Sequence, residues 1–300
     1  MMLRPGDGTR DKDAGVALAG GRDFPYTGTM TDATGPRLGG VFAEFIAAVI
    51  FLTRLPIHWR GAWPQDLDSR ALTWFPIVGT LIGAVGGLVY WGLSAVNVPP
   101  LLAALLTVGA LMGLTGALHE DGLADVADGF GGGRDREAKL TIMKDSRVGT
   151  YGAVALVLSV AARALALAAI SSPHHVAVAL MGAHAYARCL LPGMKLLLPE
   201  ARLVGHSAGV GKPNSARALA ALLAGFVLAA TTLTKLPLDG GMTRLAILLV
   251  SGGGMIALAL LARRQVGGVT GDVLGAAEQV GEILFLVAVT GALGGGASAP

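Results

Sequence analysis

The sequence predicts an all-α fold, a polytopic bundle of transmembrane helices. Only 14% of its 300 residues are charged, whereas a soluble domain has about 25%, and its mean hydropathy is strongly positive. Apolar runs long enough to cross a bilayer recur along the chain, and a run of about 18 or more residues is the signal of a transmembrane helix. A membrane β-barrel would instead show short segments of alternating polarity.

We expect about seven spans, preceded by a first helix that lies in the membrane interface or dips into the bilayer. That first segment, residues 41–57, is short and carries Glu44 and Arg54. The segments that follow are expected at 72–93, 100–118, 152–171, 175–198, 216–234, 244–262 and 283–296. Residues 1–40 are polar and aperiodic, so we expect a disordered tail before a membrane domain at 41–300.

Lysine and arginine are concentrated in alternate loops. The loops between the other segments hold only Lys235. The positive-inside rule therefore places the basic loops in the cytoplasm. The formal net charge of +3 reflects the scarcity of acids in the spans, and we do not expect nucleic-acid binding. The basic loops are residues 58–71, 119–151, 199–215 and 263–282.

Small residues and the lone cysteine are expected to serve packing. Gly79 and Gly83 have the small-xxx-small spacing that lets membrane helices approach closely. Cys189 is the one cysteine, which rules out an intramolecular disulfide. Its expected role is that of a small buried apolar residue.

Three aspartates share one helix face directly after an apolar span. Asp121, Asp125 and Asp128 stand at i, i+4 and i+7, so they fall within about a 60° arc. Like charges at this spacing repel each other. A bound Mg²⁺ or Mn²⁺ would remove that conflict, because hard cations bind carboxylate oxygens and keep waters that phosphate can replace. The alternative is a solvated acidic helix end near the positive pole of its own helix.

Glycines at 131–133 are expected to end the acidic helix, and a basic loop follows with the sequence IMKDSRVGTYG, residues 142–152. Its Lys144, Ser146, Arg147 and Thr150 suit phosphate oxygens, through charge-assisted and bidentate hydrogen bonds. No GxxxxGK[ST] motif is present. The alternative for Lys144 and Arg147 is contact with lipid headgroups.

A second glycine-rich stretch, GGVTGDVLGAAEQVGE at residues 267–282, lies on the same predicted side. Glu278 and Glu282 are expected at or inside the bilayer edge, where carboxylates are costly and indicate function. Asp272 either binds substrate or caps the next helix. Arg188 lies inside an apolar span, as does Arg163, and either can pair with a carboxylate or extend to the interface.

These motifs together resemble the cobalamin synthase family, the adenosylcobinamide-GDP ribazoletransferases. The resemblance extends over about residues 41–296 and is specific only in combination. Glu120 departs from it, because a hydrophobic residue is common there, and the 40-residue tail is an extension. The motifs that carry it are FLTRLP at 51–56, HEDGLADVAD at 119–128, and the stretches 142–152 and 267–282.

The resemblance implies a magnesium-dependent reaction in the bacterial inner membrane. A hydroxyl of α-ribazole or its 5′-phosphate attacks the cobinamide-side phosphate of adenosylcobinamide-GDP, and GMP leaves. The implied partners are these two substrates and the lipid bilayer, and a homo-oligomer is compatible with the sequence. The active site is expected on the cytoplasmic face.

The residues and the resemblance lead to the same assignment. Asp121, Asp125 and Asp128 hold Mg²⁺, while Lys144 and Arg147 bind the nonbridging phosphate oxygens. Asp128 or Glu278 takes the proton of the attacking hydroxyl. The predicted catalytic residues are Asp121, Asp125, Asp128 and Glu278. The predicted substrate- and phosphate-binding residues are Lys144, Ser146, Arg147, Thr150, Arg188, Asp272 and Glu282.

Two other functions are compatible with parts of the pattern. A CDP-alcohol phosphotransferase also uses a DG…D…D cluster on a membrane helix, but it usually has an arginine where this chain has Asp125, and longer gaps between its acids. A secondary transporter would place its carboxylates near the bilayer midplane, within internal repeats. No convincing repeat is present here.

Overall fold

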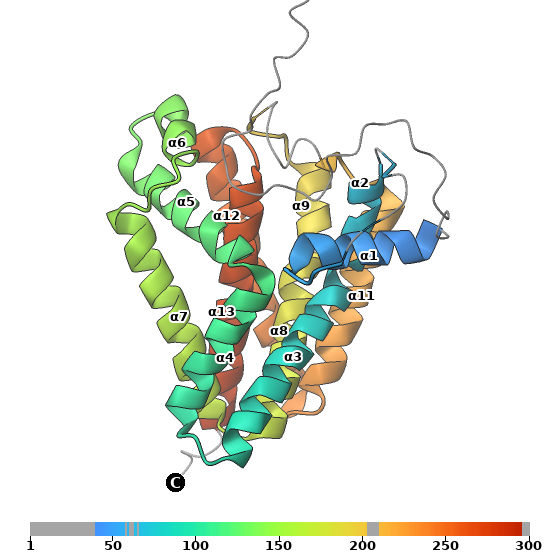
Figure 1. Cartoon of the computed structure of the whole chain (residues 1–300), viewed down its shortest axis with the longest axis vertical. Helices are drawn as coiled ribbons and strands as arrows, with labels where there is room; N and C mark the ends of the chain where they lie inside the picture. The colour runs from blue at the N-terminus through green and yellow to red at the C-terminus, as the bar shows by residue number, and fades with distance from the viewer. Residues whose placement is uncertain (1–39, 58, 60–62, 65, 203–209, 296–300) are drawn as a thin grey trace, which may run out of the picture.

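The computed structural model describes residues 40–57, 59, 63–64, 66–202 and 210–295. Apart from Gly40, the predicted disordered tail lies outside these residues. The described residues form helices and no strands, with a single isolated bridge between Glu200 and Val269. This confirms the predicted all-α fold (Figure 1).

The long helices run up and down between two ends of the molecule, and shorter ones gather at the end drawn uppermost in Figure 1. The long helices are α3 (Phe75–Ala95), α4 (Pro100–Thr115), α7 (Thr150–Ile170), α8 (Pro173–Cys189), α11 (Ser215–Leu233), α12 (Gly240–Val266) and α13 (Gly271–Gly295). The shorter ones are α1 (Gly40–Leu52), α2 (Leu67–Ala71), η1 (Leu72–Trp74), α5 (Leu118–Gly132), α6 (Arg136–Ile142) and α9 (Leu191–Leu197).

Within the part of the chain that the structure describes, six helical stretches are long and apolar enough to cross a membrane. The pair α4 and α5, bent by 94° at its break, would make a seventh. The bend follows Gly116 and Ala117, which both have left-handed backbones with φ of 64° and 52°. The chain is therefore a multi-pass helical membrane bundle, as predicted.

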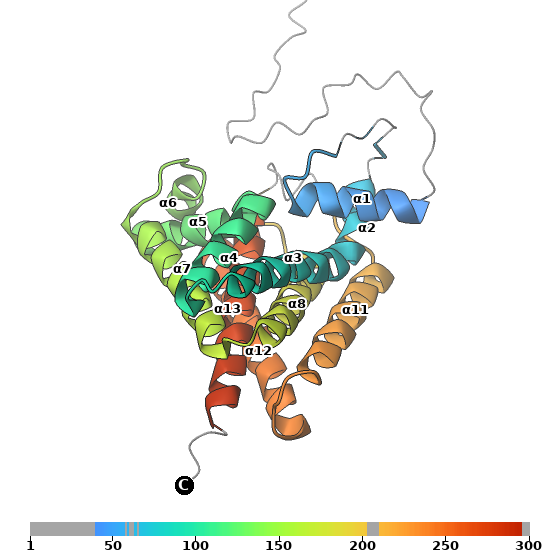
Figure 2. The ribbon, with the colours of Figure 1, turned by 60° about the horizontal axis from the view of Figure 1, so that its bottom comes forward.

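The two most buried spans form the centre of the bundle. These are α8 with α9, and α13, and Figure 2 shows α8 and α13 surrounded by α3, α4, α7, α11 and α12. Polar groups carried on α8 and α13 are therefore shielded from lipid by other helices. This is the condition under which charged side chains are tolerated inside a bilayer.

Glycines let α3 pack directly against α8. A Cβ added to Gly83 would lie 2.5 Å from the Leu180 carbonyl oxygen, and one added to Gly79 would collide with the His184 carbonyl oxygen. The predicted packing role of these two glycines is confirmed. The contact also places the C-terminal half of α8 at a defined height in the bundle.

Helix α1 has 13 residues, which at 1.5 Å per residue is too short for a hydrocarbon core of about 30 Å. It lies crosswise to the bundle axis, within the upper half of the bundle as drawn in Figure 1. Its Glu44 accepts hydrogen bonds from Arg217 of α11 at 2.8 and 3.0 Å and pairs with Arg70 of α2 at 3.1 Å. This geometry fits the predicted interfacial first helix.

Two predicted boundaries were wrong. The last helix was expected from residue 283, but α13 begins at Gly271, so Glu278 and Glu282 lie inside a helix at the bundle centre. In the connection 119–151, the acidic helix expected to end at the glycines 131–133 is present as α5, but the stretch after it was predicted as a loop and contains α6. In both places hydropathy did not predict the extent of the helix, because the charged side chains have partners distant in the sequence.

Candidate active site

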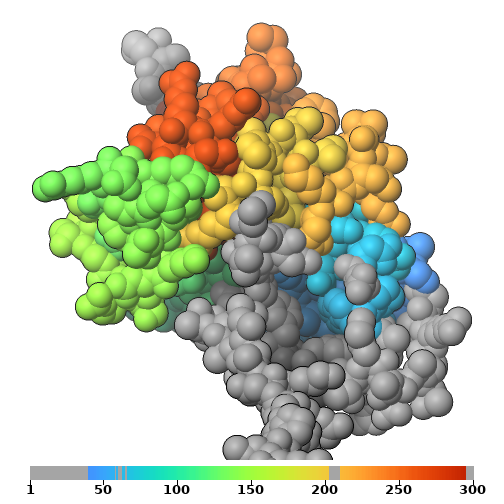
Figure 3. All heavy atoms as spheres, turned by 90° about the horizontal axis from the view of Figure 1, so that it is seen from above, coloured from blue at the N-terminus to red at the C-terminus, as the bar shows by residue number. Residues whose placement is uncertain are grey.

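Segments far apart in the sequence meet at the end of the bundle that carries α5 and α6. Ala201 donates to the Val269 carbonyl at 2.8 Å, and Val269 donates to Pro199 at 2.9 Å, so the segment after α9 lies beside the α12–α13 turn. Figure 3 looks onto this end, where the green, yellow and red parts of the chain adjoin. The predicted acidic helix, basic loop and second glycine-rich stretch are thus brought together.

Helices α5 and α13 touch through their backbones. A Cβ added to Gly122 would lie only 2.7 Å from the Asp272 carbonyl oxygen. This approach brings Asp272 of α13 near Asp121 and Asp125 of α5. Asp121 is exposed, whereas Asp125 and Asp272 are partly buried.

The carboxylates of Asp121, Asp125 and Asp272, called the acid cluster below, repel each other. Partial burial and the charges of Asp272, Asp121 and Asp128 all act unfavourably on an ionised Asp125, while Arg202 acts favourably. Arg202 Nη1 lies 3.6 Å from Asp272 Oδ2. Oxygen donors with unbalanced negative charge and access to solvent suit a hard divalent cation such as Mg²⁺.

Asp128 has a different environment from the one predicted. Its Oδ2 accepts from Gly149 N at 2.7 Å and its Oδ1 from Gly152 N at 2.8 Å. Asp128 therefore caps the N-terminus of α7 and is neutralised there by backbone donors and the helix dipole. In this structure Asp272 rather than Asp128 completes the group of facing carboxylates.

The alternative reading of Asp272 as a helix cap is also wrong. The cap of α13 is Thr270, whose Oγ1 accepts from Val273 N at 3.2 Å. The same hydroxyl donates to Asp272 Oδ2 at 3.2 Å. Thr270 thus orients the Asp272 carboxylate as well as capping the helix.

The predicted phosphate-binding loop is exposed at the same end. Lys144, Ser146, Arg147 and Thr150 are all solvent-accessible, and Thr150 is the first residue of α7. Arg147 donates to Asp145 Oδ2 at 2.6 Å, and this hydrogen bond holds the pKa of the Asp145 carboxyl at about 2. Arg147 is thus paired within its own loop, and Lys144 is the cation of the loop that faces a pocket.

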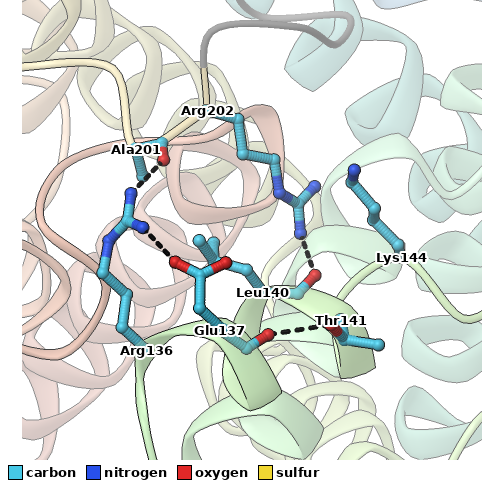
Figure 4. A pocket seen from close by; sticks show the side chains of 7 residues that line it. All are labelled: Arg136, Glu137, Leu140, Thr141, Lys144, Ala201 and Arg202. Atoms are coloured by element: carbon cyan, nitrogen blue, oxygen red, sulfur yellow. Dashed lines mark hydrogen bonds and ion pairs between the residues drawn. The ribbon is translucent and has the colours of Figure 1, made fainter.

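The pocket beside Lys144 has a volume of about 390 Å³ (Figure 4). The sequence reasoning missed Arg136 and Arg202 as site residues. Both were counted only as basic loop residues, and no motif or periodicity surrounds them. The pocket is lined by Arg136, Glu137, Leu140, Thr141, Lys144, Ala201 and Arg202.

A network of buried charged residues lies at the centre of the bundle, where α13 meets α5, α7 and α8. Arg163 of α7 pairs with Glu120 at 2.9 Å and with Glu282 at 3.5 Å. Arg188 of α8 pairs with Glu278 at 2.6 Å. All five side chains are buried, which confirms that Arg163 and Arg188 pair with carboxylates.

Two histidines complete this buried network. His119 Nδ1 lies 3.3 Å from Glu278 Oε2, and His184 Nδ1 lies 3.3 Å from Glu282 Oε2. His184, Glu278 and Glu282 are close enough to share a metal ion. However, Arg188 Nη1 is already 2.8 Å from His184 Nδ1 and 2.6 Å from Glu278, so a cation of the protein already contacts two of these three residues.

Glu278, Glu282 and Arg188 were predicted to serve catalysis or substrate binding. The structure shows all three buried and paired, Arg188 with Glu278 and Glu282 with Arg163 and His184. The signal for this pairing was present, since two arginines and two glutamates inside apolar spans have to find partners. Which residue pairs with which was not readable from the sequence.

The site and fold define a polytopic membrane protein with facing carboxylates and an adjoining cationic pocket at one end. Residues 44–290 match the family model described as Cobalamin-5-phosphate synthase, and the chain belongs to this family. No significant match was found among solved structures.

Curated relatives are similar over most of their length. A protein of Bradyrhizobium diazoefficiens is 46% identical over 82% of this chain and 93% of its own. Proteins of Azorhizobium caulinodans and Rhizobium etli are 43% and 44% identical, over 83% and 82% of this chain and 96% and 95% of theirs. All three are named adenosylcobinamide-GDP ribazoletransferase.

Asp128→Ala is expected to lower the free energy of unfolding by about 0.5–2 kcal/mol, because the backbone N–H groups of Gly149 and Gly152, at the start of α7, lose their acceptor. An SDS titration of the purified protein in mixed micelles measures this. Asp239→Ala is the matched control, since Asp239 precedes α12 without a side-chain capping bond. An unchanged unfolding midpoint for Asp128→Ala would contradict the capping role.

Glu278→Gln is expected to destabilise the protein by about 3–5 kcal/mol, because Arg188 is left as a buried charge without its partner. The double variant Glu278→Met, Arg188→Met should recover much of this loss, since no unpaired charge remains. Unfolding midpoints in micelles measure both. A general base would show the opposite pattern, with stability retained and turnover lost.

Proposed function

We propose that the protein transfers the adenosylcobinamide-phosphate group of adenosylcobinamide-GDP to α-ribazole or α-ribazole 5′-phosphate and releases GMP. The acid cluster beside exposed cations, at one end of a membrane bundle of this family, carries the proposal. The names of the relatives support it. The family match does not favour a CDP-alcohol phosphotransferase.

Mg²⁺ is the proposed cofactor, held by Asp121 and Asp125 together with Asp272. When bound, it would neutralise the diphosphate and the charge that develops on the departing GMP. The residues fit such an ion because they offer carboxylate oxygens that repel each other, a repulsion that Arg202 partly offsets. Asp128 is left out of this set because backbone donors occupy both of its oxygens.

The side chains at this end bind and orient the substrates. The exposed ammonium group of Lys144 donates hydrogen bonds to the nonbridging phosphate oxygens. Arg147 would donate to the same oxygens once its ion pair with Asp145 is broken. Ser146 and Thr150 offer hydroxyl donors beside them. Phosphoryl transfer depends mainly on positioning and charge neutralisation, so a buried base is not required, and neither Asp128 nor Glu278 is assigned that role.

We place the active site on the cytoplasmic side of a bacterial inner membrane. The end that carries the acid cluster also carries the basic loops, and the opposite turns at 96–99, 171–172 and 234–239 together hold only Lys235. By the positive-inside rule, the acid cluster then faces the cytoplasm, where nucleotides and magnesium are available. The bilayer is the remaining proposed partner.

Asp125→Asn is expected to reduce GMP release from adenosylcobinamide-GDP by about 100-fold or more, because loss of a metal-binding carboxylate removes several kcal/mol of transition-state stabilisation. Purified protein in micelles, supplied with α-ribazole and Mg²⁺, is assayed for GMP and for cobalamin. Asp239→Asn, exposed at the opposite end, is the control. Turnover at the wild-type rate would remove Asp125 from the site, and CMP release from a CDP-alcohol substrate would favour the rival function.

Chelation of divalent ions is expected to stop the reaction, and Mg²⁺ or Mn²⁺ should restore it, because both are hard oxygen-binding cations. Mn²⁺ bound to the corrinoid-free protein can be counted by electron paramagnetic resonance. Asp125→Asn should lower this binding, whereas Asp128→Asn should leave it close to that of the wild type. Equal loss in both variants would return Asp128 to the metal-binding set.

A further inference from the structure

We propose that Arg202 binds the phosphate of the departing nucleotide, and that the pocket between α6 and the segment Ala201–Arg202 holds that nucleotide. The inference rests on the proposed function for the identity of the nucleotide. It adds a residue and a direction of substrate binding that the sequence motifs did not contain.

The size and charge of the pocket fit a nucleotide rather than the corrinoid. Small-molecule sites enclose roughly 300–1,000 Å³, and this pocket, at about 390 Å³, is at the small end of that range, too small for a corrin macrocycle with its substituents. Its lining contains three cationic residues and one acidic residue, Glu137, which is itself bonded to Arg136 (Figure 4). An anionic ligand of modest size is therefore the expected occupant.

Arg136 forms a wall of the pocket. Its Nε donates to the Val266 carbonyl at 2.9 Å and its Nη2 to the Ala201 carbonyl at 2.7 Å. These bonds tie α6 to the end of α12 and to the segment after α9, while Nη1 of Arg136 bonds to Glu137. Lys144 Nζ, in contrast, has no hydrogen bond or ion pair with any residue that the structure describes.

Arg202 stands between the pocket and the acid cluster. Its Nη2 donates to the Leu140 carbonyl at 2.6 Å, which holds the guanidinium against the end of α6. Its Nη1 lies 3.6 Å from Asp272 Oδ2, and its Nε is buried without a hydrogen-bond partner among the described residues. A phosphate bound by Arg202 would therefore lie beside the carboxylates proposed to hold the metal.

This position defines what Arg202 does in the reaction. The attacking hydroxyl oxygen forms a bond to the cobinamide-side phosphorus, and the bond from that phosphorus to the bridging oxygen breaks. The bridging oxygen keeps the electron pair and leaves as part of GMP, while the hydroxyl proton passes to water. Arg202 binds the phosphate that gains this charge, a role for which a rigid guanidinium is well suited.

The experiment measures GMP binding to the purified full-length protein in micelles, without any corrinoid. Arg202→Gln is expected to weaken GMP binding by about 10- to 100-fold, the loss typical of a hydrogen bond to a charged group. Lys144→Gln should also weaken it, while Arg264→Gln, an exposed cation at the end of α12, should bind as the wild type does. Arg202→Lys keeps the positive charge but loses the paired guanidinium donors, so its affinity for GMP should lie between those of the wild type and Arg202→Gln.

Thermal unfolding of each variant separates binding from folding, because Arg202 also contacts α6. A folded Arg202→Gln variant that binds GMP as tightly as the wild type overturns the inference. Arg202-dependent GMP binding in a protein that makes no cobalamin supports the nucleotide pocket and counts against the proposed function. If the protein makes cobalamin, and added GMP inhibits the Arg202→Gln variant as strongly as the wild type, the proposed function is supported and the pocket assignment is overturned.

Discussion

The structure depends on neutralising buried charge at the centre of the bundle. Glu120, Glu278 and Glu282 lie there with Arg163 and Arg188, and each unpaired ion would cost several kcal/mol. The shortest pairs join different helices, at 2.6 Å for Arg188 with Glu278 and 2.9 Å for Arg163 with Glu120. The network is satisfied only when α5, α7, α8 and α13 meet in one arrangement.

This buried network positions the reactive end of the molecule. Glu120 precedes Asp121 directly, so the salt bridge to Arg163 fixes the start of α5 and with it the acid cluster. Gly122 allows α5 to touch α13 near Asp272. Asp128, at the far end of α5, fixes the start of α7. The charges that support the fold, Glu120 and Asp128, therefore flank the carboxylates proposed for catalysis along a single helix.

The end of the bundle that carries α5 and α6 has charges of both signs next to each other. The acid cluster suits a divalent cation, and Lys144 and Arg202 suit phosphate oxygens. Arg202 lies close to both, 3.6 Å from Asp272 and in the wall of the pocket. A metal-bound diphosphate is complementary to this pattern, because the metal ion would offset the acid cluster and the phosphates would offset Lys144 and Arg202.

Composition and hydropathy alone determined the membrane class and most of the spans, and the aspartate spacing predicted that Asp121 and Asp125 share one helix face. The aspartate spacing on α5 is local information, since a helix places i and i+4 on one face. Tertiary structure decided the rest. It made Asp128 a cap for Gly149 and Gly152, brought Asp272 into the acid cluster, and buried Glu278 with Arg188. These contacts join residues far apart in the chain, where pairing depends on helix packing that no local pattern encodes.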